Sequence, residues 1–135
     1  YMPRTRKPRK AARKSRKAPK KKIIIGMIYA DWCGYCKELK PHWRKMKNKI
    51  KRAMGNSLNN VHISFHELGD NEVTREKGLT VDDVINDFNE KHLSGVDGVQ
   101  YSGFPTLFKI SKKRIDYYNG ERKENGIYRW ATDKL

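Results

Sequence analysis

The longest apolar run of the chain, residues 23–30, is hydrophobic on both faces, as a central strand buried between two layers requires. Its eight residues fall far short of the ~20 that cross a bilayer, so the sequence predicts no transmembrane helix. From Leu39 the apolar residues recur in steps of four, three, four and four, which predicts one stripe of a helix. Pro41 should kink the first turns of that helix, and Gly55 is placed to end it.

Two stretches in the middle of the chain predict a strand and a second helix. Apolar and polar residues alternate over residues 61–66, which indicates a strand. Thr80 and Asp83 resemble the two partners of a capping box, and apolar residues follow them at helical spacing. We therefore expect a helix over about residues 81–92.

The last third of the chain predicts a hairpin and a short helix. Residues 106–110 and 114–118 have strand-like composition and flank a polar turn. Ile127, Trp130 and Ala131 suggest a terminal helix. The predicted order is strand, helix, strand, helix, strand, strand, helix, which is an α/β arrangement.

Composition divides the chain into a basic tail and one domain. The 135 residues suffice for a single core. Residues 1–22 hold 12 of the 31 Lys and Arg residues and none of the 15 acids, so the net charge of +16 divides into +12 on this segment and +4 on residues 23–135. Charge repulsion and three prolines favour an extended chain. We expect a disordered tail at 1–22 and a folded domain at 23–135.

Three interpretations of the tail compete. The first is nucleic-acid binding or nuclear targeting, since unopposed cations bind phosphates and residues 10–15 (KAARKS) are similar to part of a core histone tail. The second is binding to a membrane surface or another acidic partner, and the third is a solvating tail or one that lies against the acidic residues 67–97. The candidate phosphate contacts are Arg4, Arg6, Lys7, Arg9, Lys10, Arg13, Lys14, Arg16, Lys17, Lys20, Lys21 and Lys22.

The same segment bears on localisation. Basic residues before a short apolar run imitate a secretory signal, but cleavage after Ala30 would remove the strand that precedes the cysteines. A mitochondrial transit peptide needs an apolar stripe that residues 1–22 lack. We expect an intracellular protein without a signal peptide, located in the nucleus or in a virion.

The candidate chemistry lies in Trp32-Cys33-Gly34-Tyr35-Cys36, between the first strand and the first helix. Cysteines three apart on a helical turn have side chains within reach of a disulfide. Cys33 would lie at the helix N-terminus, where free N–H groups favour a thiolate, whereas Cys36 would be buried and protonated. This asymmetry indicates a nucleophile and a resolving partner, against the alternative of two ordinary core cysteines.

Metal binding is the rival interpretation of the cysteine pair. His62 and His66 would complete a Cys2His2 zinc set. If both lie on one strand, however, they are ~13 Å apart, too far to share one ion. We therefore expect no metal and no other cofactor, and we expect His42 and His92 to be solvated helix residues.

These residues carry a resemblance to a known family. Residues 29–37 (YADWCGYCK) resemble the active-site segment of the thioredoxin family, whose helix-kinking proline corresponds to Pro41. Residues 103–107 (GFPTL) resemble its cis-proline loop, and Gly120 matches a glycine after its last strand. The resemblance covers about residues 23–135.

The resemblance implies a thioredoxin-like fold, with a central mixed sheet flanked by helices on both faces. It also implies thiol–disulfide exchange through Cys33 and Cys36, with a cis bond at Phe104-Pro105. Trp32, Gly34, Tyr35, Phe104 and Pro105 would support the active site.

Three departures from the family matter. The strand and helix that usually precede the active-site strand are replaced by the tail, so the domain is minimal and one sheet edge should be exposed. Met27 occupies the position of the family's buried carboxylate, which leaves the proton acceptor for Cys36 unassigned. The dipeptide Gly34-Tyr35 leaves the direction of exchange open, because potentials in the family span roughly −270 to −120 mV.

Charge is polarised within the domain. Residues 37–52 hold eight Lys or Arg against one acid, and residues 67–97 hold nine acids against three cations. In the implied fold these helices lie on opposite faces of the sheet. The basic face is either a solvated helix surface or an attraction site for acidic substrates and nucleic acid.

The sequence therefore predicts a monomeric thiol–disulfide oxidoreductase that acts on protein thiols and disulfides. An electron donor or acceptor such as a reductase or glutathione would complete its cycle. The alternative is a redox-inert nucleic-acid-binding or virion structural protein, since a thioredoxin domain behind a basic tail is similar to proteins of large DNA viruses.

Overall fold

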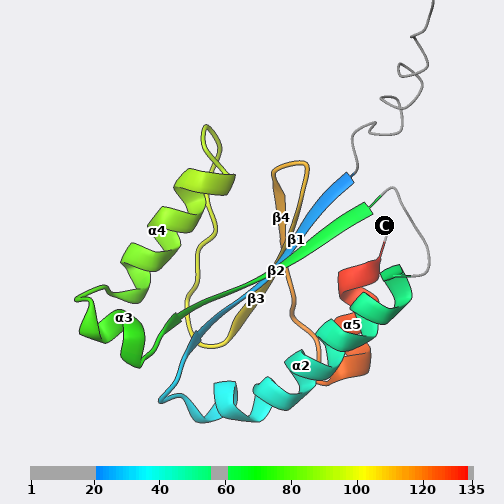
Figure 1. Cartoon of the computed structure of the whole chain (residues 1–135), viewed down its shortest axis with the longest axis horizontal. Helices are drawn as coiled ribbons and strands as arrows, with labels where there is room; N and C mark the ends of the chain where they lie inside the picture. The colour runs from blue at the N-terminus through cyan, green and yellow to red at the C-terminus, as the bar shows by residue number, and fades with distance from the viewer. Residues whose placement is uncertain (1–20, 56–60, 134–135) are drawn as a thin grey trace, which may run out of the picture.

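The computed structural model describes residues 21–55 and 61–133, and it has one helix more than the sequence predicts (Figure 1). Its elements are β1 (Lys21–Ala30), α2 (Gly34–Gly55), β2 (Val61–Asp70), α3 (Glu72–Glu76), α4 (Val81–His92), β3 (Thr106–Ser111), β4 (Arg114–Tyr117) and α5 (Glu124–Thr132).

The strands form one mixed sheet in the order β2-β1-β3-β4. β1 is parallel to β2 and antiparallel to β3, and β3 and β4 form the predicted hairpin. β1 is therefore central, as its two-faced apolar run requires. β2 lies at one edge of the sheet, where the minimal version of the fold was expected to leave a strand unpaired.

Each face of the sheet carries its own core. On one face, α2 and α5 cover Ile23, Ile25 and Met27. On the other, α4 packs over Ile28 and Phe108. The α/β prediction with helices on both faces is thus confirmed, including the placement of basic α2 and acidic α4 on opposite faces (Figure 1).

A glycine in the central strand makes room for the second core. Gly26 pairs with Phe108 across β1 and β3, and a Cβ atom at Gly26 would lie 2.1 Å from the Phe108 ring. Because no side chain tolerates that approach, the end of the Phe108 ring can lie this close to β1 only where residue 26 has no Cβ.

The predicted boundary between tail and domain needs correction, whereas the predicted start of the first helix is confirmed. β1 begins at Lys21, so Lys21 and Lys22 belong to the sheet, not to a disordered tail; the other ten cations of the tail lie outside the described residues. The start of α2 at Gly34, directly after Cys33, confirms the predicted place of Cys33 at the helix N-terminus, and the apolar stripe follows from Leu39.

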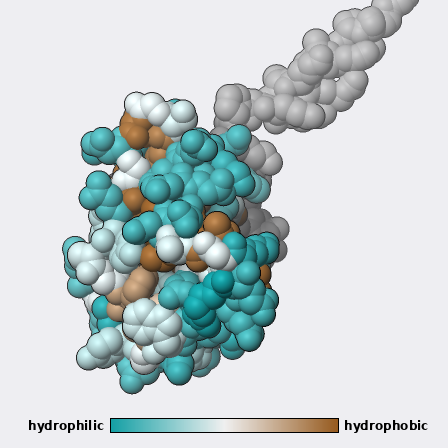
Figure 2. Space-filling model, turned by 90° about the vertical axis from the view of Figure 1, so that its left-hand side faces the viewer, coloured by the Kyte–Doolittle hydropathy of each residue, from teal (hydrophilic) through white to brown (hydrophobic). Residues whose placement is uncertain are grey.

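The helix that the sequence analysis missed is α3. It has five residues and no buried side chain, so it has no apolar stripe to detect. Its signal is a capping box, in which Asn71 accepts from the Thr74 N–H while the Thr74 hydroxyl accepts from the Asn71 N–H. The face of the molecule over α3 and α4 is largely hydrophilic, with scattered apolar residues (Figure 2).

α5 ends on a buried cation. Lys109 of β3 is 7% exposed, and its ammonium group donates to the carbonyl oxygens of Trp130 and Asp133. A positive charge at a helix C-terminus satisfies carbonyls that have no partner within the helix.

Along the described ranges, every helix is too short or too polar to span a membrane.

Candidate active site

The cysteine pair lies at the junction of β1 and α2. The Cys33 carbonyl accepts the Lys37 N–H at 3.1 Å, which places Cys33 immediately before the first helical residue. Cys36 follows within the first turn. Both residues are buried as free thiols, with exposed fractions of 9% for Cys33 and 5% for Cys36.

The two thiols have opposite acid–base properties. Burial alone raises the pKa of Cys33, but hydrogen bonds from the Cys36 thiol and from the backbone N–H groups of Cys36 and Tyr35 outweigh it, together with the charge of Arg122. The net pKa of Cys33 lies below its ordinary value. Burial raises the pKa of Cys36 to about 11, and its hydrogen bond to Cys33 adds to this shift. Cys33 is therefore the more acidic thiol, the one that forms a thiolate more readily, and Cys36 is the partner that keeps its proton.

The cis-proline loop lies against the cysteines. The Phe104-Pro105 peptide bond is cis, in agreement with the resemblance. The Cys33 thiol donates to the Phe104 carbonyl at 3.7 Å, and Phe104 packs against the small core formed by Ala30, Cys33 and Cys36. Residues separated by 71 positions in the sequence thus meet at the nucleophile.

Two exposed aromatic side chains flank the pair. Trp32 is 62% exposed and contacts the Phe104 ring edge to face, with ring centres 5.6 Å apart. Tyr35 is 65% exposed and lies beneath the guanidinium group of Arg122. Gly34, between the cysteines, has open space where a Cβ would be, so nothing near it requires glycine.

The predicted site residues of the domain are therefore brought together. Trp32, Gly34 and Tyr35 share the cysteine segment, while the fold brings in Phe104 and Pro105 from the loop directly before β3. Of the predicted tail contacts, Lys21 and Lys22 lie in β1, and the remainder fall outside the described residues.

Arg122 is a functional residue that the sequence analysis missed. It lies two residues after Gly120, on the segment that joins β4 to α5, and its charge lowers the pKa of both cysteines. A lone arginine in a basic chain carries no distinguishing signal. Only the return of this segment to the start of α2 reveals it.

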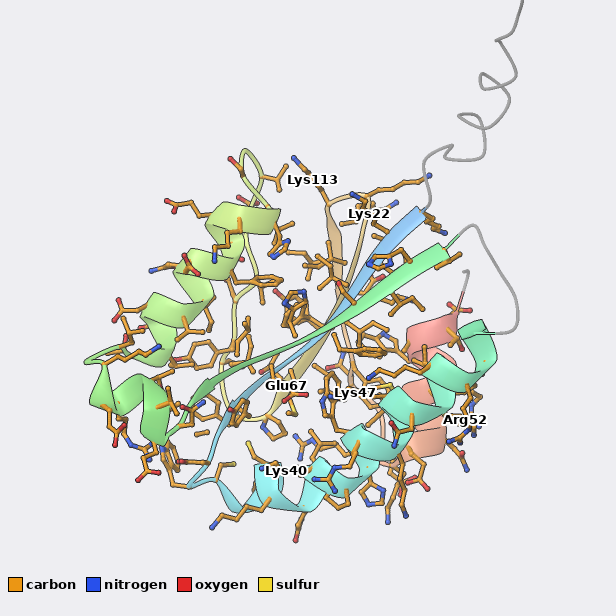
Figure 3. The ribbon with its side chains drawn as sticks, in the orientation of Figure 1. Lys22, Lys40, Lys47, Arg52, Glu67 and Lys113 are labelled. Carbon is orange, nitrogen blue, oxygen red and sulfur yellow. The ribbon has the colours of Figure 1, made fainter. Side chains whose placement is uncertain are left out.

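Glu67 is the second missed residue. It is the register partner of Met27 in β2, so a carboxylate does lie beside the position where the family places one. Its oxygen accepts from the Trp43 indole and the Lys47 ammonium, both at 2.8 Å, and Figure 3 shows Glu67 and Lys47 side by side. Burial raises the pKa of Glu67, but these hydrogen bonds lower it by more, so the net pKa lies below its ordinary value. Glu67 is therefore a paired anion that points to α2 residues beyond Cys36.

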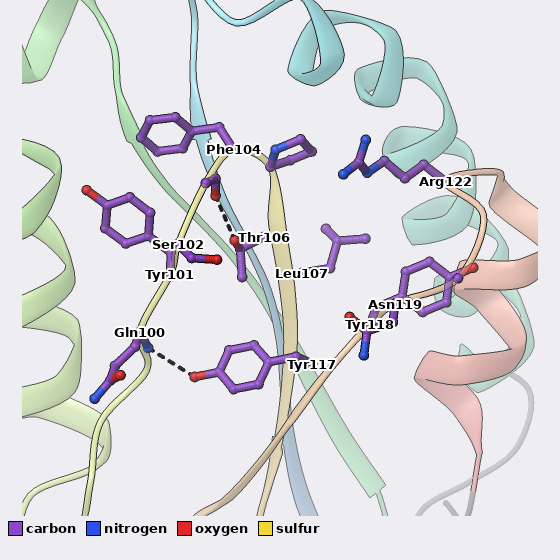
Figure 4. A pocket seen from close by; sticks show the side chains of 13 residues that line it. Gln100, Tyr101, Ser102, Phe104, Thr106, Leu107, Tyr117, Tyr118, Asn119 and Arg122 are labelled. Atoms are coloured by element: carbon purple, nitrogen blue, oxygen red, sulfur yellow. Dashed lines mark hydrogen bonds between the residues drawn. The ribbon is translucent and has the colours of Figure 1, made fainter.

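A groove of about 590 Å³ runs beside the cis-proline loop (Figure 4). Tyr101 stacks on Phe104 along one side, and Arg122 projects from the opposite side. The Tyr117 hydroxyl accepts the Gln100 N–H at 3.0 Å and ties the loop to β4. The groove adjoins the cysteines through Phe104 and Pro105, although neither cysteine lines it.

The histidines have structural environments. His62 and His66 lie on β2, as predicted. The expectation that His42 and His92 are solvated is wrong, because both are half-buried: His42 pairs with Glu124, and His92 packs its ring against His66 and Phe88. Within residues 21–55 and 61–133, no three His, Cys, Asp or Glu side chains gather into a group that could hold a metal ion.

Comparison with known proteins agrees with this site. The thioredoxin family matches residues 11–133. A probable protein disulfide-isomerase A4 of Caenorhabditis elegans is 32% identical over 114 residues, which cover 83% of this chain and 14% of that protein. A thioredoxin domain-containing protein of Acanthamoeba polyphaga mimivirus is 40% identical over 37 residues, or 27% of this chain and 11% of that protein. The chain thus spans a small part of these relatives.

Solved structures share the fold. The zinc-bound form of human ERp44 superposes with a TM-score of 0.52 at 19% identity, over 81% of this chain and 25% of that one. Full-length ERdj5 gives a TM-score of 0.50 at 17% identity, over 96% of this chain and 16% of that one.

Proposed function

Because the chain belongs to the thioredoxin family, we propose that it exchanges thiols and disulfides through Cys33 and Cys36. The observation that carries this proposal is the asymmetry of the two thiols: the pKa of Cys33 lies below its ordinary value, and that of Cys36 is raised to about 11. A redox-inert scaffold has no need of a nucleophile and a proton-holding partner at the start of one helix.

The reaction follows from this asymmetry. The Cys33 thiolate attacks one sulfur of a substrate disulfide, the substrate S–S bond breaks, and the departing sulfur takes up a proton. Cys36 then loses its proton and attacks Cys33, so the mixed disulfide breaks and the substrate leaves as a dithiol. The protein is left with a Cys33–Cys36 disulfide, which a dithiol reductase or two glutathione molecules reduce. The reverse sequence would oxidise a substrate.

Polypeptides are the substrate class that suits the surface. Trp32 and Tyr35 are exposed beside a buried nucleophile, and the groove next to Phe104 is lined by backbone and aromatic groups. An extended peptide can pair with such a loop and present its own disulfide to Cys33. Several relatives are named protein disulfide-isomerases, which supports proteins rather than small disulfides as substrates.

Isomerisation is the direction that the Cys36 environment favours. The carboxylate of Glu67 is committed to Trp43 and Lys47, and the adjacent position holds Met27. A thiol with a pKa of about 11 resolves mixed disulfides slowly near neutral pH. Long-lived adducts allow a substrate to rearrange its own disulfides before release.

We further propose that the basic tail associates with nucleic acid in the nucleus or in a virion. Its support is charge: residues 1–20, which precede β1, hold ten cations and no acid. The exterior of α2 adds exposed Lys40, Arg44, Lys45 and Arg52. Such a surface would bind phosphates with little sequence specificity.

Reduction of insulin disulfides tests the exchange activity. The expected result is turnover that Cys33→Ser abolishes, while Cys36→Ser accumulates mixed disulfides visible by mass spectrometry of the intact protein. Alkylation of each cysteine across pH should show Cys33 reacting at lower pH than Cys36. Equal reactivity of the two thiols, or insulin reduction that survives Cys33→Ser, would contradict the proposal; a chain without turnover would favour the redox-inert alternative.

A further inference from the structure

Two carboxylates lie side by side at the carboxyl ends of β1 and β2, next to the segment that carries Cys33. Asp31 follows the last residue of β1, and Asp70 ends β2. The two strands are parallel and in register to their last pair, and the Asp31 N–H donates to the Asp70 carbonyl at 2.9 Å. The negative charges of Asp31 and Asp70 repel one another at these strand ends.

Arg75 of α3 bridges the pair. Its guanidinium group donates to both carboxylate oxygens of Asp31, each at 3.0 Å, and to Oδ1 of Asp70 at 2.9 Å. The two guanidinium nitrogens of Arg75 thus bind Asp31 in the bidentate geometry that an arginine and a carboxylate prefer. Nη1 also donates to Asp70, so one nitrogen binds both acids. An ammonium group cannot reproduce all three bonds in this arrangement.

Polar contacts alone hold α3 in this position. The helix has no buried side chain, so apolar packing does not dock it. Its capping box orders the turn that leaves β2, and the Asn71 amide donates to the Tyr29 hydroxyl at 2.9 Å. Arg75 adds the three bonds to Asp31 and Asp70, and it thereby ties α3 to the ends of both strands.

The second oxygen of Asp70 is committed to the active site. Oδ2 accepts the indole N–H of Trp32 at 2.8 Å. The Trp32 ring contacts Phe104, whose carbonyl accepts the Cys33 thiol. A continuous series of contacts therefore runs from Arg75 through Asp70 and Trp32 to Phe104 of the cis-proline loop, which contacts Cys33.

We propose that Arg75 is a positioning residue for polypeptide substrates: by clamping Asp31 and Asp70 it fixes the exposed Trp32 ring beside Cys33. This inference rests on the proposed exchange function. A side chain that is 62% exposed has little packing to restrain it, so its orientation depends on the indole hydrogen bond and on the contact with Phe104. A ring that is ordered beforehand loses less entropy when a peptide packs on it.

The clamp should affect large and small substrates differently. A polypeptide must cover Trp32 to bring its disulfide to Cys33, whereas a small disulfide needs only access to the sulfur. Removing Arg75 leaves Asp31 and Asp70 to repel one another, which frees Asp70 from the position in which it accepts the indole. The loss should appear mainly in KM for the polypeptide, because the reacting sulfur is unchanged.

The test compares Arg75→Ala with wild type on insulin and on 2-hydroxyethyl disulfide. We expect kcat/KM for insulin to fall about fivefold, mostly through KM, and turnover of the small disulfide to stay within about twofold. Arg75→Lys should recover part of the loss. Lys91→Ala removes another exposed cation that pairs with an acid, the i,i+4 partner Asp87 of α4, and serves as the matched control with unchanged kinetics.

A double-mutant cycle with Trp32→Ala isolates the mechanism. If the clamp acts through the indole, Arg75→Ala costs nothing further in the Trp32→Ala background. Full additivity of the two losses, or equal losses for insulin and the small disulfide, would overturn the inference. So would unchanged insulin kinetics in Arg75→Ala.

The orientation of Trp32 can be measured without catalysis. In protein labelled with 5-fluorotryptophan, the resonance assigned through Trp32→Phe should move toward the free amino acid in Arg75→Ala and stay in place in Lys91→Ala. An unmoved resonance in Arg75→Ala would overturn the clamp even if the kinetics changed. If wild type showed no exchange, the proposed function and the kinetic part of the inference would fall together, and the resonance would still decide the geometry.

Discussion

The guanidinium carbon of Arg122 lies 5.7 Å from the centre of the ring of Tyr35, the residue between Gly34 and Cys36. The ring is one of two exposed aromatic groups at the site, and a cation over its face is attracted by the ring electrons. This contact keeps a positive charge beside both cysteines, whose pKa values it lowers.

Removing that charge should make both thiols weaker acids. In Arg122→Ala the pKa of Cys33 rises, so less thiolate is present at neutral pH and alkylation of Cys33 at pH 7 slows by about two- to fivefold. Resolution by Cys36 should slow as well. Stopped-flow alkylation against pH measures the shift. Lys123→Ala, which removes the neighbouring exposed cation, should leave the profile in place; an unshifted profile in Arg122→Ala would show that its charge does not reach the thiols.

A carboxylate at position 27 should accelerate the resolving step. Met27 is buried beside β2 residue Glu67, and Cys36 must lose its proton in a buried site. Met27→Glu supplies a proton acceptor, so decay of mixed disulfides near pH 7 should quicken, while the variant loses stability because a carboxylate replaces an apolar side chain. The measurement is adduct decay across pH.

Met27→Gln is the matched control, because it adds a polar group of similar size that does not titrate. It should lose stability without gaining speed. An unchanged rate and pH profile in Met27→Glu would show that Cys36 already has another base.

Removing the tail should abolish most nucleic-acid affinity. β1 begins at Lys21, so truncation before that residue spares the sheet and deletes ten cations. If all ten met phosphates on duplex DNA, log K would fall with log salt at a slope of about −9, and about half that slope is realistic. Fluorescence anisotropy at several salt concentrations measures it. Affinity that survives truncation, or that ignores salt, would assign binding to another surface, whereas insulin reduction should be unaffected.

Mild acid should destabilise the domain through His66. Burial, followed by the charge of His92, lowers the pKa of His66 below 6.5, and its ring packs against Phe88 on the α4 side of the sheet. The unfolded chain therefore binds the proton more readily, so stability is complete above pH 6.5 and falls as the pH drops through that value. Urea unfolding at pH 7.5 and 5.0 should show a loss that is smaller in His66→Gln by ~0.5 kcal/mol, since the ring is partly exposed. An equal loss in both proteins would assign the pH dependence to other groups.

The elements that bury a regular apolar pattern could be predicted from the sequence. The two-faced run at 23–30 became the central strand, and the capping box at Thr80 and Asp83 begins α4 at Val81. The cis-proline loop, in contrast, was expected only from the resemblance of residues 103–107 to the thioredoxin family, whereas the pattern around Cys33 and Cys36 marked the cysteine pair itself. The features predicted from a pattern are local, because each depends on the spacing of residues within one element.

Only the tertiary structure decided which charged residues act on the thiols or lie near the active site. Arg122, Glu67 and Arg75 come from three separate segments, and their identity as surface charges in a highly charged chain gives no sequence signal. Their effects depend on which elements the fold brings together. Arg122 acts on both cysteines because α5, which follows it, packs against α2. Glu67 reaches Trp43 and Lys47 because β2 pairs with β1, with Glu67 next to Met27. Helix α3 escaped prediction for the same reason, since charge pairing across the sheet edge, and not an apolar stripe, holds it in place.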